Sequence, residues 1–136
     1  MEQFADRFKV AFVSPLSFFL SIAILAFLLR AAVAGEYEDG LAAVKKEDYR
    51  TAFKKWEPLA EKGNPDAQFG LGYMYLQGQG VVLNYKEAMK WFRMAAEQGD
   101  PDAQNNLGLM YAVGTGVIED PVYALMWFEL AAANGS

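Results

Sequence analysis

The chain has 136 residues, a net charge of −5, and neither cysteine nor histidine. This length suits one domain at most, and the two missing residue types exclude disulfides, Ser-His-Asp and Cys-His catalytic sites, and zinc sites built from Cys and His. Beyond residue 35 no stretch is strongly basic, which argues against nucleic acid as the main partner because phosphate binding needs clustered Lys and Arg.

Residues 1–34 are predicted to be a secretory signal peptide or a membrane anchor. Arg7 and Lys9 precede an uncharged, mainly apolar run at residues 10–29, and Ala-Val-Ala follows at 32–34. That order is the layout of a signal peptide, with cleavage expected after Ala34. The run is also about 20 residues long, just enough to cross a bilayer as a helix, so a retained anchor is the first alternative and a buried core helix the second. Under the signal and anchor interpretations, residues 35–136 lie outside the cytoplasm, because the positive residues stay inside.

Residues 35–64 are expected to form an imperfect pair of helices. Its first helix, at about residues 36–46, is short and lacks the Gly-x-Gly loop that later units have. Its second segment, residues 48–64, parallels residues 84–100. Pro58 lies inside this second helix, where we expect it to bend the helix or shift its register. The end units of repeat proteins commonly depart from the repeat pattern, because the end of a stack faces water on one side.

Residues 65–100 and 101–136 are two copies of one unit. They align at an offset of 36 residues without a gap, so that PDAQFGLGYMYLQGQG is matched by PDAQNNLGLMYAVGTG. Self-similarity at such a period is the mark of a solenoid, in which one helix pair buries its faces only against its neighbours.

Each unit is predicted to contain two helices. Asn64 caps the first helix, with Pro65 in its first turn, and Gly78 and Gly80 end it. Asn84 caps the second helix. In the last unit the first helix is predicted to start at Asp100-Pro101 and the second at Asp120-Pro121. Apolar residues recur at three- and four-residue intervals in both helices. The sequence therefore predicts an all-α fold: an α-α superhelix of about three antiparallel helix pairs, preceded by a separate apolar N-terminal helix.

The conspicuous side chains of the repeats are interpreted as structural. Trp91, Trp127, Phe92 and Phe128 could form an aromatic ligand box, but their identical places in both units favour core packing. Acidic residues lie at predicted helix starts, where the helix dipole and free N–H groups stabilise carboxylates; they are Asp66, Asp102, Glu119 and Asp120. The glycine loops complete no nucleotide-binding motif. The sequence therefore predicts no cofactor and no metal site.

The pattern A-Q-x-x-L-G-x-x-Y-x-x-G-x-G-V, followed by A-x-x-W-F-x-x-A-A-x-x-G, resembles the Sel1-like repeat, a relative of the tetratricopeptide repeat. Residues 67–99 and 103–135 carry it almost complete, residues 48–64 carry it in part, and residues 36–47 only weakly. The resemblance implies a right-handed superhelix and a role as an adaptor or scaffold for protein partners. One branch of the family has a disulfide in each repeat and is linked to penicillin binding; this chain has no cysteine, so that activity is not carried over.

Positions that differ between the repeats are the candidates for binding, because the framework of a solenoid repeats while its binding surface varies. In the resembled fold the first helices line the concave side, where exposed aromatic and aliphatic residues would make a groove for a peptide or helix. Packing of Phe69 and Tyr73 against the unit before them is the alternative. The candidates are Phe69, Tyr73, Leu76, Gln77, Asn105, Leu109, Ala112 and Val113.

The sequence thus favours a non-catalytic, exported scaffold that binds a protein or peptide and meets a membrane only through an uncleaved N-terminal segment. The alternative is a cell-envelope enzyme or cell-wall-active factor that uses carboxylates such as Asp66 and Asp102. Val122, Leu125 and Leu130 stand where the previous repeat has Lys86, Met89 and Met94. These apolar replacements predict self-association, or a partner, at the C-terminal repeat.

Overall fold

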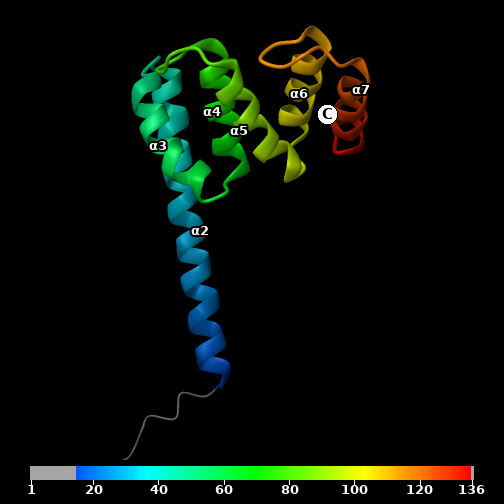
Figure 1. Ribbon diagram of the computed structural model, residues 1–136. Coiled ribbons are helices and arrows are strands. Elements are labelled where there is room, and N and C mark those ends of the chain that lie inside the picture. Colours follow the sequence, from blue (N-terminus) through cyan, green and yellow to red (C-terminus); the bar gives the residue numbers. More distant parts are fainter. Residues whose placement is uncertain (1–14, 136) are drawn as a thin grey trace, which may run out of the picture. The chain divides into compact units, whose positions relative to one another are not determined.

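The computed structural model describes residues 15–135, and within that range it contains helices and no strand (Figure 1). The predicted all-α class is confirmed. In chain order the helices are α2 (Pro15–Lys45), α3 (Tyr49–Glu61), α4 (Pro65–Gln77), α5 (Tyr85–Glu97), α6 (Pro101–Val113) and α7 (Pro121–Ala133).

The apolar N-terminal helix is present, and it continues without a break into the first helix of the first unit. Alanines at positions 31, 32 and 34 favour helix, and no proline lies between Pro15 and Lys45 to stop it. The helix is therefore longer than the short segment expected to begin near residue 36. By length and composition α2 could cross a membrane, and its large apolar side chains between residues 16 and 29 are exposed. Arg7, Lys9 and the start of the apolar run lie outside the described residues.

From Gly35 onward the chain forms one compact unit, and helices α4 to α7 begin where the sequence predicts. The Asn64 side chain accepts a hydrogen bond from the N–H of Ala67 at 2.9 Å, and Asp100 accepts one from Ala103 at 2.7 Å. Asp48, Asn84 and Asp120 cap α3, α5 and α7 in the same way. These caps satisfy N–H groups that have no partner inside the helix.

The ends of the helices also follow from the sequence. Gly78 adopts φ 68° and its N–H bonds the carbonyl of Met74; Gly114 adopts φ 70° and bonds Met110. Glycine suits this left-handed conformation because it has no Cβ. Helix α3 continues through Pro58 and ends at Glu61.

Close helix contacts depend on glycine opposite large aromatic rings. A Cβ added at Gly72 would lie 2.6 Å from the Phe92 ring, and one added at Gly108 would lie 2.6 Å from Phe128. Phe92 is fully buried, and Trp91 and Trp127 are each only 8% exposed. The core-packing interpretation of these aromatic residues is confirmed, with Phe128 only partly buried.

Among the described residues, two glutamines are the buried polar side chains. The side-chain amide of Gln68 donates to the carbonyl of Ala60 at 3.0 Å, and Gln104 donates to Ala96 at 2.9 Å. Both side chains are buried. Each therefore joins a first helix to the second helix of the unit before it.

Candidate functional site

A pocket of about 300 Å³ opens between the first helix pair, α2 and α3, and helix α4, which begins the next repeat. Helix α4 contributes Phe69 and Tyr73, two of the residues predicted to bind a partner. Around them the lining is mainly aromatic and aliphatic, which is usual for a ligand site. The other lining residues are Tyr37, Leu41, Val44, Tyr49, Trp56, Gly70, Met74 and Gln79.

Trp56 holds the walls of this pocket together. Its ring stacks on Tyr37 with a centroid distance of 5.5 Å, and its Nε1–H donates to the Tyr37 carbonyl at 3.1 Å. The indole also occupies the space that a side chain at Gly40 or Gly70 would need. Trp56 is buried, so it fixes α2 and α4 at a short distance from α3.

Phe69 and Tyr73 differ in how much they present to a partner. Their rings lie 6.5 Å apart, and the Phe69 ring also packs on Phe92 at 5.6 Å. Phe69 is partly buried, whereas 44% of Tyr73 is exposed. Phe69 therefore packs on the second helix of its own repeat as well as lining the pocket, and Tyr73 is the more accessible aromatic group.

Three carboxylates act on Tyr37, one of the aromatic residues that line the pocket. The pKa of Tyr37 is raised above its ordinary value, first because the hydroxyl is desolvated and then because the carboxylates of Asp66, Glu38 and Asp100 oppose its ionisation. The sequence places no Lys or Arg between residues 63 and 85. Lys55, on α3, lies 3.4 Å from the carboxylate of Asp39 and is thus already paired.

The remaining predicted binding residues do not line this pocket. Leu76 and Ala112 are partly buried and pack against the core. Gln77 is exposed, and Asn105, Leu109 and Val113 lie one repeat further on, with Leu109 and Val113 exposed. Their binding role stays a prediction.

Of the residues that line this pocket, the sequence comparison between the repeats named only Phe69 and Tyr73 as binding candidates. Tyr37, Leu41 and Val44 belong to the end of α2, where the repeat pattern is weakest. The available signal was the aromatic and aliphatic residues at three- and four-residue spacing from Tyr37 to Val44, which mark one face of a helix.

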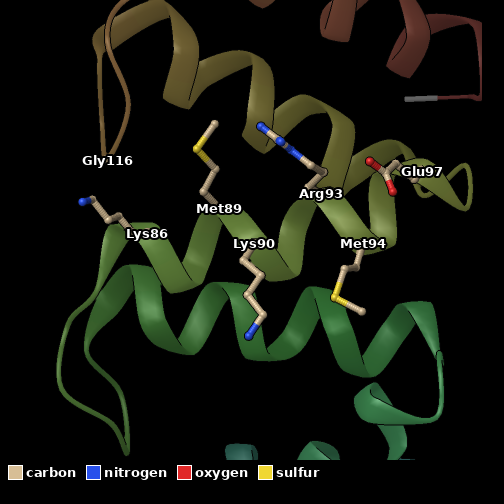
Figure 2. Close-up of a pocket in the computed structure, with 7 residues that line it drawn as sticks. All are labelled: Lys86, Met89, Lys90, Arg93, Met94, Glu97 and Gly116. Atoms are coloured by element: carbon tan, nitrogen blue, oxygen red, sulfur yellow. The ribbon is translucent and has the colours of Figure 1, made fainter.

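A second pocket, of about 380 Å³, lies along α5 and is basic (Figure 2). Lys86, Lys90 and Arg93 line it with Glu97, the two methionines Met89 and Met94, and Gly116. Figure 2 shows Met89 and Arg93 on the opposite side of α5 from Lys90 and Met94.

Two of the four charged residues that line the α5 pocket, Lys90 and Arg93, already have partners within the chain. Arg93 donates to the Tyr111 hydroxyl at 2.8 Å. Lys90 pairs with Glu87 at 3.3 Å and lies 5.0 Å from the centre of the Trp91 ring. These interactions favour a structural role for much of the basic surface.

The acidic residues named as alternative catalytic groups lie at equivalent places in successive repeats. Asp66 is in the first turn of α4 and Asp102 in the first turn of α6, and both are exposed. Asp120 is the N-cap of α7. These positions favour stabilisation of helix starts for all three carboxylates.

Comparisons with known proteins agree with this architecture. The chain matches the Sel1 repeat at residues 28–64, 65–100 and 101–136, and no curated protein matches it significantly. It is similar to the crystal structure of c5321, a protective antigen present in uropathogenic Escherichia coli strains displaying an SLR fold. The TM-score is 0.74 and the identity 39%, over 79% of this chain and 24% of that one.

A Sel1 repeat protein from Oxalobacter formigenes is also similar, with a TM-score of 0.70 and 37% identity, over 74% of this chain and 41% of that one. The chain thus spans less than half the length of either protein. Three repeat matches cover most of its residues, and the helix pairs described above are their structural counterpart. The chain belongs to the Sel1 repeat family.

Proposed function

We propose that this chain is a non-catalytic, exported scaffold that binds a protein or peptide through the pocket around Tyr73. The observation that carries the proposal is a half-exposed aromatic side chain in a pocket whose other aromatic groups are fixed by packing. Rigid aromatic groups lose little side-chain entropy on binding and are enriched in energetically important contacts. Sel1 repeats are commonly protein-interaction scaffolds, and this supports the same assignment.

Pull-down from cell-envelope extracts tests the binding site. The bait is the full chain in mild detergent, compared with Tyr73→Ala and with Val82→Ala. Val82 is 87% exposed and lies outside the pocket. We expect a specific partner that Tyr73→Ala loses and Val82→Ala retains. Equal capture by all three chains would contradict the proposal.

Export of the repeats is the second part of the proposal. The apolar residues of α2 up to Leu29 are unburied, and a basic stretch precedes them in the sequence, an order that leaves the positive end inside. Cell fractionation with mass spectrometry of the N-terminus tests it. A chain that begins at Gly35 outside the cytoplasm supports cleavage, an intact chain in the membrane with protease-accessible repeats supports an anchor, and a cytoplasmic chain contradicts export.

We also infer a contact surface on α7. Leu125 is 58% exposed, whereas Met89, at the same place on α5, is buried against the next repeat. Val122 and Leu130 are exposed beside it. Sedimentation of the full chain in detergent should show association at micromolar concentration that Leu125→Lys weakens; a monomer for both chains would contradict this inference.

A further inference from the structure

We propose that the pocket around Tyr73 selects a cationic peptide, in which Arg or Lys stands beside an aromatic or aliphatic residue. The proposal rests on the proposed function, because it names the chemistry of the partner at the same site. Three properties of the molecule carry it: the distribution of charge between the helices, the carboxylates around Tyr37, and the aromatic lining of the pocket.

The first helices of the two full repeats carry negative charge and no cation. Helices α4 and α6 contain no Lys or Arg, and the one charged residue of each is an aspartate in its first turn, Asp66 or Asp102. Helices α3 and α5 each carry three cations and two glutamates, α7 carries only Glu129, and Lys45 ends α2. A partner that reaches α4 therefore meets an aspartate and no cation on that helix.

Three carboxylates act on one aromatic residue of the pocket, Tyr37. Asp66, Glu38 and Asp100 come from three different segments, yet all three disfavour ionisation of the same hydroxyl, that of Tyr37. Because the Tyr37 hydroxyl stays protonated at neutral pH, it adds no opposing charge and leaves an oxygen that can accept a hydrogen bond. Carboxylates grouped in this way attract a cation and repel an acidic peptide.

The aromatic and aliphatic lining of the pocket suits the side chains of such a peptide. Tyr37, Tyr73 and Phe69 surround a space of about 300 Å³, large enough for one or two side chains of a peptide. An Arg or Lys head placed over a tyrosine or phenylalanine face gains a cation–π contact, and its aliphatic stem packs on Leu41 and Val44. An adjacent aromatic or aliphatic residue of the peptide would fill the remaining apolar volume.

Competitive selection from three peptide pools tests the charge preference. The pools are capped hexapeptides with Ala, Leu, Phe, Ser and Tyr mixed at four positions, and with Arg, Gln or Glu fixed at the other two. They are offered together to the immobilised full chain, and the retained peptides are quantified by mass spectrometry. We expect about tenfold enrichment of the Arg pool over the Gln pool, exclusion of the Glu pool, and a loss of enrichment in about 0.5 M salt.

Single-charge variants locate the source of the preference. Asp66→Asn should reduce enrichment of the Arg pool about threefold and leave retention of the Gln pool unchanged. Asp102→Asn is the matched control, because it removes the same charge from the equivalent turn one repeat away. We expect that control to behave like the unaltered chain. Equal effects of the two substitutions would overturn selection by the pocket, since only a diffuse attraction would remain.

The outcomes separate this inference from the proposed function. If Gln peptides are retained as well as Arg peptides and Tyr73→Ala releases both, the pocket binds peptides but the charge preference is overturned. If retention of every pool is independent of Tyr73, both the inference and the proposed site are overturned. Retention of the Glu pool that Lys86→Gln abolishes would place binding at the basic pocket of α5 and overturn the cationic preference.

Discussion

The side-chain amide of Gln98 donates to the side-chain oxygen of Gln68 at 2.8 Å, and Asn134 makes the equivalent bond to Gln104 at 3.0 Å. Gln68 and Gln104 also donate to the second helix of the preceding unit. Each glutamine thus joins three helices with one buried side chain. Polar groups in a core are costly unless paired, so a fully paired glutamine fixes the spacing of neighbouring repeats.

Replacement of Gln68 by leucine should lower the free energy of unfolding by about 1–3 kcal/mol. The substitution removes both bonds. The Ala60 carbonyl then keeps the Gly63 N–H as a donor, at 3.0 Å, and the Gln98 amide donates only to the Met94 carbonyl, at 3.4 Å. Urea denaturation followed by circular dichroism measures the effect. Gln77→Leu, on the same helix but exposed, is the control and should change stability by less than about 0.5 kcal/mol. Equal effects of the two changes would contradict the paired role of Gln68.

The elements of this fold could be predicted because the rules that set them are local. A cap such as Asn64 and a left-handed glycine such as Gly78 are read from a few neighbouring residues. Trp91 recurs at the same place in the next repeat as Trp127, which predicts core positions for both, and both are buried.

The pocket could be predicted only in part, because it joins segments that the repeat pattern does not align. Phe69 and Tyr73 stood out as variable positions, but Tyr37 reaches the same pocket through its stacking on Trp56. Gly40 leaves room for the Trp56 ring, and the connection between α2 and α3 is shorter than the Gly-x-Gly loops of the later repeats. The walls of the pocket therefore depend on the tertiary packing of the irregular first helix pair, which the repeat pattern does not describe.

Gly72→Ala should destabilise the chain by about 1–3 kcal/mol, although alanine is the better helix former. The added methyl group would lie 2.6 Å from the ring of Phe92, which is fully buried. Gly35→Ala is the matched control, because no atom lies within 4 Å of its added Cβ. We expect that control to be neutral or to stabilise by up to about 1 kcal/mol. Thermal unfolding of both variants measures the difference, and a stabilising Gly72→Ala would disprove the tight contact.

Trp56→Phe and Trp127→Phe should have different costs. Trp56 loses its hydrogen bond to the Tyr37 carbonyl, a change worth about 0.5–1.5 kcal/mol beyond the lost packing. The Nε1 of Trp127 is buried and has no hydrogen-bond partner among the described residues, so its removal relieves an unpaired donor. We therefore expect Trp127→Phe to be the milder change in urea denaturation. A larger loss for Trp127→Phe would show that its Nε1 has a partner in solution.

The cap of α3 should make a pH-dependent contribution to stability. Hydrogen bonds from Thr51 hold the pKa of Asp48 below its ordinary value. Because the folded-state pKa is the lower one, the stabilisation is present at neutral pH and is lost as the pH falls through that value. The difference in melting temperature between the unaltered chain and Asp48→Ala should therefore shrink in acid.

Asn64→Ala is the control, because it removes a cap that does not titrate. The loss of melting temperature that it causes should stay constant from neutral pH to the lowest pH at which the chain remains folded. A deficit for Asp48→Ala that is equally constant would mean that the charge of this carboxylate does not contribute to the cap.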